Sequence, residues 1–270
     1  MDQELRRIFR DGSTSYYYSS LFLPSGVKED VFRLYAFVRT ADDFVDSEPQ
    51  DRQGFYSFRE DTERALETGE SDRKVIEALL EARENGIEDD WIEAFLDAME
   101  MDLEKSRYET VDETLEYTYG SAEVIGLMMC EILDLDPGAK EPAQLMGRAM
   151  QYANFLRGVK EDNGLGRQYL PQEEVERHGL EDLSREEARG NPEKFREFMR
   201  AEIDRYRQWS DEARKGLKYI PYRSRVPVDL SSRLYRWTAE RIEKRPLRVY
   251  EEKVRPSKTR IAYELLRSAV

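Results

Sequence analysis

The stretch Tyr35-Ala-Phe-Val-Arg-Thr-Ala-Asp-Asp-Phe-Val-Asp46 indicates both the fold and the place of the chemistry. The apolar residues Val31, Leu34 and Val38 recur at helical spacing, so the stretch predicts the end of a helix that faces a core. At 100° per residue, Asp42 and Asp46 fall about 20° and about 60° from Val31, on the same apolar stripe.

Two carboxylates one turn apart on a buried face would each cost several kcal/mol if they stayed unpaired. A divalent cation of the magnesium type is the simplest partner, because it takes oxygen ligands and keeps positions open for substrate phosphates. The alternative is that the apolar stripe ends at Val38 and that water solvates both aspartates. The aromatic residues and the arginine that precede the aspartates favour the cation site.

Length and composition indicate a heavily charged helical protein. The chain has 270 residues, of which 39% are hydrophobic and 37% charged, as expected for a soluble, helix-rich protein. No apolar run reaches the roughly 18 residues of a membrane span, and the charged start is unlike a signal peptide, so we expect a cytoplasmic protein. The single cysteine, Cys130, excludes an internal disulfide and lies in an apolar run that predicts a core position.

Charge is distributed unevenly along the chain. Residues 214–270 contain 16 Lys or Arg against 6 Asp or Glu, whereas the whole chain has a net charge of −14. The acidic bulk argues against a nucleic-acid partner. The basic end could close over an anionic substrate, contact anionic lipid, or pair with the acidic part. Arginine outnumbers lysine by 32 to 11, and with the excess of acid this hints at a high-salt setting.

Helical patterns dominate the rest of the chain, and no stretch alternates as a strand would. Turn-forming residues such as Pro24, Gly86 and Pro137 separate the patterns, and no repeat or linker divides them. We therefore expect a single all-α domain over residues 1–270. The predicted helices cover residues 28–46, 51–68, 71–84, 89–106, 111–135, 142–163, 191–219, 229–244 and 256–268.

A second polar constellation lies in Gln151-Tyr-Ala-Asn-Phe-Leu-Arg-Gly-Val-Lys-Glu-Asp162. Gln151, Glu161 and Asp162 share a helix face with Asn154, within about 80° of it. The glycines that follow end the helix and bring Arg167 and Tyr169 back towards its last turn. Alone, such a face indicates a hydrated surface. Together with the first acidic helix, it predicts two helices that face one cavity, where bridging metal ions could hold a diphosphate leaving group.

With these motifs in view, nearly the whole chain resembles the head-to-head prenyl transferases, the squalene and phytoene synthases. Among the subgroups it looks most like archaeal, halophile-type phytoene synthases, partly through Ser257-Lys258. The resemblance rests on Ser13-Thr-Ser-Tyr-Tyr17 with Leu23-Pro24, Tyr35–Arg39 with Asp42 and Asp46, Met101-Asp-Leu-Glu-Lys-Ser-Arg-Tyr108, Tyr117-Thr-Tyr-Gly-Ser-Ala122 with Gly126-Leu, and Gln151…Asn154…Arg157…Glu161-Asp162…Gly166-Arg-x-Tyr-Leu-Pro171.

The resemblance implies a single-domain, isoprenoid-synthase-type helical bundle with a central cavity. Two geranylgeranyl diphosphates would condense there to phytoene through a cyclopropyl (prephytoene) diphosphate, the first committed step of carotenoid biosynthesis. Mg²⁺, or Mn²⁺ in its place, would assist, and phytoene formation would need no NADPH. The carbocation would need an apolar, water-excluding wall, for which Met128 and Met129 are candidates.

The resemblance also implies roles for particular residues. The candidate catalytic residues are Asp42, Asp46, Tyr35 and Arg39. The candidate metal ligands are Asp42, Asp46, Asn154, Glu161 and Asp162. The candidate diphosphate-binding residues are Ser13, Ser15, Tyr16, Tyr35, Arg39, Gln151, Arg157, Tyr169 and Tyr235.

Two positions depart from the family pattern. Gly158 stands where the second acidic motif has its first aspartate, and Glu123 stands where glycine is usual. Glu161 could substitute for the missing aspartate, or metal binding could be weakened. Two alternatives stay open: a squalene or presqualene diphosphate synthase that uses farnesyl diphosphate, and, with Gly158 as the motive, a catalytically weak relative that acts as a scaffold. The sequence leaves open whether the chain is a monomer or homodimer and whether it touches a membrane peripherally.

Overall fold

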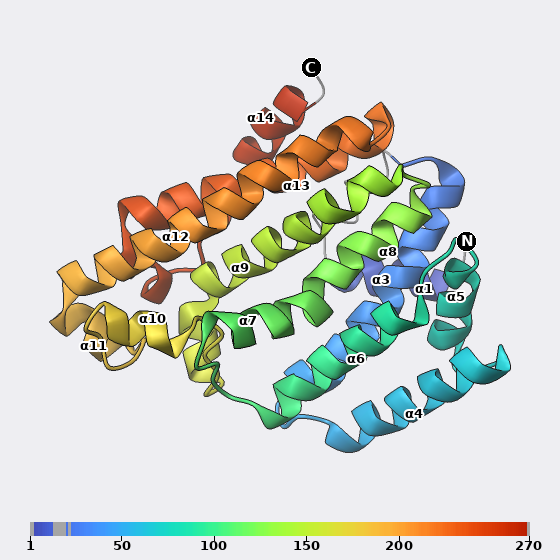
Figure 1. Cartoon of the computed structure of the whole chain (residues 1–270), viewed down its shortest axis with the longest axis horizontal. Coiled ribbons are helices and arrows are strands. Elements are labelled where there is room, and N and C mark those ends of the chain that lie inside the picture. Colours follow the sequence, from blue (N-terminus) through green and yellow to red (C-terminus); the bar gives the residue numbers. More distant parts are fainter. Residues whose placement is uncertain (1–2, 13–19, 21–22, 269–270) are drawn as a thin grey trace.

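The computed structural model describes residues 3–12, 20 and 23–268, and these residues form a bundle of helices (Figure 1). The expectation of an all-α fold is confirmed: within the described part, the only β-type pairing is one isolated bridge between Arg107 and Gln168. The α-helices are α1 (Gln3–Gly12), α3 (Ser25–Asp46), α4 (Arg52–Thr68), α5 (Lys74–Arg83), α6 (Asp89–Glu104), α7 (Val111–Thr118), α8 (Val124–Ile132), α9 (Lys140–Gly164), α10 (Gln172–Arg177), α11 (Arg185–Gly190), α12 (Pro192–Arg214), α13 (Tyr222–Lys244) and α14 (Lys258–Ser268).

Helix α3 carries the first acidic motif and buries a stripe that differs from the predicted one, of which Val31 and Val38 are only partly buried. Phe37, Ala41 and Val45 are each at most 1% exposed, and Phe37 packs against the rings of Phe58 and Phe95. The helix begins at Ser25, directly after Pro24, because proline has no backbone N–H to donate and its ring disfavours a helical conformation of the residue before it. Burial of this stripe fixes the rotation of α3 and therefore the direction of the aspartates at its end.

Helices α7 and α8 are joined by a π-helical turn, Tyr119–Glu123, instead of forming the uninterrupted helix expected over 111–135. Gly120 allows this turn to approach α6, because a Cβ there would lie 2.2 Å from the carbonyl oxygen of Ala94. The Glu123 carboxylate is 2% exposed and accepts hydrogen bonds of 2.7 and 3.1 Å from Arg148 on α9. The buried acid at position 123 is therefore neutralised by an arginine of the neighbouring helix.

Helix α9 crosses the bundle and packs against α8, α12 and α13. Two glycines allow the close approach of α8 and α9. A Cβ at Gly126 would lie 2.3 Å from the Ala143 carbonyl oxygen, and one at Gly147 would lie 2.2 Å from that of Ala122. Any larger side chain at either position would push these helices apart.

Several helix boundaries differ from the expectation. The sequence pattern did not predict α1, α10 or α11, which are short or lie in polar segments. The expected start of a helix at residue 229 was wrong, because α13 begins at Tyr222 and contains Pro227. Proline costs this helix one backbone hydrogen bond, but Pro227 is buried in the wall of a cavity, where its ring packs. Among the described helices, none is long and apolar enough to cross a bilayer.

Candidate active site

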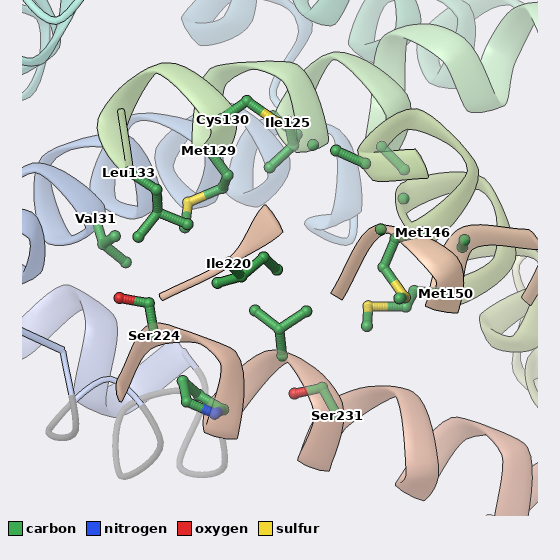
Figure 2. Close-up of a pocket in the computed structure, with 18 of the residues that line it drawn as sticks. Val31, Ile125, Met129, Cys130, Leu133, Met146, Met150, Ile220, Ser224 and Ser231 are labelled. Carbon is green, nitrogen blue, oxygen red and sulfur yellow. The ribbon is translucent and has the colours of Figure 1, made fainter. Parts of the chain in front are cut away.

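A cavity of about 440 Å³ lies among helices α3, α8, α9 and α13 (Figure 2). Its wall is mainly apolar. Met129 contributes to it, whereas Met128 is 1% exposed in the core and does not line it. The labelled side chains that surround the space in Figure 2 are Val31, Ile125, Met129, Cys130, Leu133, Met146, Met150, Ile220, Ser224 and Ser231.

The polar end of the cavity lies where α3 and α9 approach their C-terminal ends. Tyr35 and Val38 line it from α3, and Gln151 and Asn154 line it from α9. Asp42 follows Val38 by one helical turn, so it stands just beyond the apolar wall. The structure therefore brings the two acidic helices to one end of one apolar cavity.

Asp42 is partly buried, and burial raises its pKa to about 7, with a further rise from the nearby charge of Asp46. Asp46 itself is exposed and accepts a hydrogen bond of 3.0 Å from Arg167. The two aspartates of the first motif thus differ, because one is crowded by negative charge and the other is already paired. A cation beside Asp42 would relieve the cost of its burial.

On α9, burial and the charge of Glu161 raise the pKa of Asp162 to about 7. Asn154 donates a hydrogen bond of 3.1 Å to Gln151, but its Oδ1 is buried and has no partner within the described structure. Position 158 faces the Asp162 carboxylate, since a Cβ on Gly158 would lie 3.0 Å from Asp162 Oδ2. The second motif therefore lacks a carboxylate at position 158, a gap in the motif directly beside Asp162, although the Asp162 side chain itself lies against the glycine.

Arg167 joins the two acidic regions. Its side chain is 10% exposed, and its guanidinium donates to the Val45 carbonyl oxygen at 2.6 Å as well as to Asp46. Its pKa is raised, because the effects of the surrounding Tyr169, Asp102 and Asp46 outweigh its burial. This arginine follows α9 by three residues, and its backbone N–H donates to the Asp162 carbonyl oxygen at 2.8 Å, which confirms the predicted return towards the last turn of α9. Its hold on the end of α3 was not predicted.

Asp102 on α6 is a site residue that our helical-face argument missed. It is 6% exposed and accepts hydrogen bonds of 2.7 Å from both Tyr117 and Tyr169. Burial raises its pKa to about 6, although both hydrogen bonds and Arg167 oppose the rise. The signal in the sequence was the motif Met101–Tyr108, but nothing in its helical spacing connected Asp102 with the other acidic helices.

The remaining candidates lie around this centre with different partners. Tyr35 stacks on Phe9 with ring centroids 4.0 Å apart, and Arg39 pairs with Asp43. The Arg157 guanidinium lies 5.9 Å from the ring centre of Tyr235, which lines the cavity.

Three candidates, Ser13, Ser15 and Tyr16, lie outside the described residues. Glu161 pairs with Lys253, with Oε1 3.5 Å from Nζ, and its Oε2 is buried without a hydrogen-bond partner in the described part. Glu161, which we expected to replace the missing aspartate, therefore has one carboxylate oxygen paired with Lys253.

The donor set fits a magnesium ion that arrives with a phosphate-bearing substrate. Mg²⁺ needs only one or two protein carboxylates when phosphates and waters complete its octahedron. Asp42, Asp162 and the unpartnered Oδ1 of Asn154 are oxygen donors of this kind. Over residues 3–12, 20 and 23–268, no three Asp, Glu, His or Cys side chains converge on one point. These residues therefore suit an ion whose coordination is shared between the protein and the substrate phosphates, and not an ion held by protein ligands alone.

An all-α bundle around an apolar cavity, with acidic helices at one end, defines the isoprenoid-synthase type of fold. The chain belongs to the squalene/phytoene synthase family, whose profile matches residues 9–261. Members of this family are prenyltransferases. The expected family and enzyme class are thereby confirmed.

Individual relatives agree with this assignment. The chain is 29% identical to 15-cis-phytoene synthase from Synechococcus elongatus, over 93% of this chain and 86% of that protein. It is 32% identical to the chloroplastic phytoene synthase 2 of Oryza sativa, over 85% of this chain and 60% of that one.

Solved structures show the same fold. Squalene synthase HpnC from Alicyclobacillus acidocaldarius superposes with a TM-score of 0.80 at 24% identity, covering 90% of this chain and 92% of that one. A ligand complex of a dehydrosqualene synthase superposes with a TM-score of 0.83 at 23% identity, covering 98% of this chain and 94% of that one.

Proposed function

We propose that this chain condenses two molecules of geranylgeranyl diphosphate, head to head, into phytoene. The observation that carries the proposal is the joining of two acidic helix ends, with Asp42 on α3 and Asp162 on α9, at one end of an apolar cavity. The phytoene synthases among the relatives favour this product over squalene. The archaeal, halophile-type subgroup stays a prediction.

The reaction begins when one substrate loses its diphosphate and becomes an allylic cation. The double bond of the second substrate attacks this cation, and loss of a proton closes a cyclopropane ring that still bears the second diphosphate. Departure of that diphosphate, rearrangement and loss of another proton give phytoene. Two diphosphates and two protons leave, so the condensation needs no reductant.

The residues at the polar end would hold and orient the diphosphates. Arg157 supplies a positive charge near the cavity, while the Gln151 amide and the Tyr235 hydroxyl are neutral groups able to form hydrogen bonds there. Tyr35 and Arg39 stand on the α3 side of the same end. Mg²⁺, with Mn²⁺ as a substitute, would be held by Asp42, Asp46, Asn154 and Asp162, and when bound it would neutralise charge that develops on the leaving diphosphate.

The apolar wall would protect the cation from water. Methionines and aliphatic side chains from α8 and α9 surround the cavity, and their contact with the substrate tails would exclude the nucleophile that quenches the cation. Helices α8 and α9 are held in close contact by Gly126 and Gly147, so this part of the wall is preorganised.

The test is to incubate purified protein with geranylgeranyl or farnesyl diphosphate and Mg²⁺, with and without NADPH, and to analyse the hydrocarbons. We expect phytoene from the longer substrate without NADPH. Squalene or presqualene diphosphate from the shorter substrate would assign the chain to the squalene branch instead. Absence of product from both substrates would contradict the proposal.

A scaffold function is the second candidate, and the gap at Gly158 is the observation that favours it. Thermal unfolding with Mg²⁺ and a non-hydrolysable diphosphate analogue separates the two. An enzyme should be stabilised by the pair more than by either component alone. A scaffold that has lost the site should show no such joint effect.

A further inference from the structure

Helices α13 and α14 pack together and form a basic region in an otherwise acidic protein (Figure 1). Residues 222–236 and 255–268 contain eight Lys or Arg and only two acidic residues, Asp229 and Glu264, whereas the net charge of the chain is −14. We call the exposed side of these two stretches the basic face.

Both acids of these stretches are buried beneath the arginines. Asp229 is 7% exposed and pairs with Arg214 at 2.7 Å and Arg233 at 2.6 Å. Glu264 is 1% exposed and pairs with Arg260 and, at 3.7 Å, with Arg267. Negative charge therefore points inward and positive charge points outward.

The outer side of α14 also carries large apolar groups. Leu266 is 71% exposed and Tyr263 is 51% exposed, and both point away from the buried Glu264. The guanidinium carbons of Arg260 and Arg267 lie 5.2 and 5.7 Å from the Tyr263 ring centre. Aromatic and aliphatic side chains beside arginines suit the boundary between lipid headgroups and acyl chains.

The first turn of α13 continues this pattern. Tyr222 is 53% exposed, with the Arg225 guanidinium 5.6 Å from its ring centre. Arg223, Arg255 and Lys258 form no ion pair with any residue in the described part of the chain. These cations stay available to an external anionic surface.

We propose that the basic face docks on an anionic lipid bilayer. The occupant follows from charge complementarity, because a negative surface with an apolar interior matches both the unpaired cations and the exposed Tyr263 and Leu266. A second copy of this chain is a poorer match, since its basic face would repel the first and only its acidic parts would attract. This docking stands apart from the proposed reaction.

The basic face also adjoins the cavity. Ile220 and Ser224, on either side of Tyr222 in sequence, both line the cavity wall (Figure 2). One short segment thus belongs to both the cavity wall and the docking surface. If the proposed function holds, an apolar product would have a short path from the cavity to the bilayer.

The experiment is flotation of the purified full chain with vesicles of phosphatidylcholine mixed with phosphatidylglycerol, and with vesicles of phosphatidylcholine alone. We expect binding to the anionic vesicles that weakens with added salt and is much lower on the neutral ones. A double variant, Tyr263→Ser with Leu266→Ser, should lower the partition coefficient by about tenfold. A charge variant, Arg223→Glu with Lys258→Glu, should lower it at least as far.

Tyr56→Ser is the matched control, because Tyr56 is also exposed, at 39%, but lies on α4 away from the basic face. It should bind vesicles as the wild type does. Circular dichroism and thermal unfolding check that each variant is folded. Because the two variants change different side chains, the proposal can still be tested with one of them if the other does not fold. Failure to float with anionic vesicles, or equal binding by all variants, would overturn the proposal. A dimer in light scattering that the Leu266 variant dissociates would assign the face to self-association and would also overturn it.

Discussion

The two acidic helix ends that meet at the cavity are built differently. The end of α3 has both aspartates of its motif, and one of them, Asp46, is bound by Arg167. The end of α9 has one aspartate, an amide and a glycine, and its remaining acid, Glu161, pairs with Lys253. The first end offers a full motif that is partly neutralised, while the second offers a reduced motif with a gap beside Asp162.

This difference teaches how many fixed charges such a site requires. Asp42, Asp102 and Asp162 already have raised pKa values because burial and mutual repulsion disfavour their charged forms. A further carboxylate at position 158 would add to that repulsion in the absence of a cation. With Gly158, the free protein holds less charge, and the substrate diphosphate must supply more of the metal coordination.

The largest effect should come from the complete motif. Asp42→Asn should lower turnover of geranylgeranyl diphosphate by about a thousandfold or more, because it removes a charged oxygen donor at the leaving group. Asp90→Asn, exposed in the first turn of α6 and away from the site, should leave turnover within a few-fold of wild type. Product formation at saturating Mg²⁺ measures both. Substantial activity in folded Asp42→Asn protein would contradict the metal assignment on both helices.

A smaller loss is expected when the link between the two ends is removed. Arg167→Gln should reduce turnover by about a hundredfold and lower the melting temperature, since Val45 and Asp46 lose their shared donor. Arg107→Gln is the control, because Arg107 is nearby but its side chain is 42% exposed and makes only long ion pairs in the described part of the chain, 3.4 Å to Glu109 and 4.0 Å to Glu176. Similar activity for both variants would show that the two acidic ends act independently.

Restoring the reduced motif should shift metal dependence more than rate. Gly158→Asp should lower the Mg²⁺ concentration for half-maximal activity by about fivefold, because the new carboxylate would stand beside Asp162. Gly158→Ala supplies the same Cβ, 3.0 Å from Asp162 Oδ2, without the charge; it reports the effect of displacing Asp162 alone and should not lower the Mg²⁺ requirement. If the aspartate variant titrates like wild type, position 158 does not face the ions.

The smallest effect is a dependence of stability on pH. In the folded protein the pKa values of Asp42 and Asp162 are about 7 and that of Asp102 is about 6, against an ordinary value of 3.8. Between about pH 4 and about pH 7, these aspartates are protonated in the folded protein but ionised in the unfolded chain. The free energy of unfolding therefore falls as the pH rises through this range.

Asp162→Asn should therefore raise the melting temperature of the ligand-free protein at pH 8 by about 3 °C and change it little near pH 4. Differential scanning calorimetry at the two pH values measures this. A lower melting temperature of the variant at pH 8 would mean that the Asp162 charge is stabilising in the free protein.

Much of this arrangement could be predicted from local periodicity. The 3.6-residue pattern placed Asp42 in line with Val31, Leu34 and Val38, which line the cavity, and located α9 within a few residues. It could not place Asp102, because its partners Tyr117 and Tyr169 are distant in sequence and meet it only through packing. It also gave no reason for Glu123, whose partner Arg148 lies on a different helix. The pairing of Glu161 with Lys253 was hidden for the same reason.

The π-helical turn at Tyr119–Glu123 has the geometry of a single-residue insertion. In an uninterrupted α-helix, Ile125 and Met129 would point about 80° and about 120° away from Tyr117. The additional residue in the turn reduces these angles to about −20° and about 20°, so all three share one stripe. Helix α7 can thereby bring Tyr117 to Asp102, while α8, on the same continuous helix, brings Ile125 and Met129 to the cavity wall. If the extra residue were removed, Ile125 and Met129 would still point in the same direction as Tyr117. The widened turn, which carries Ser121 at the cavity and Glu123 against Arg148, would be lost.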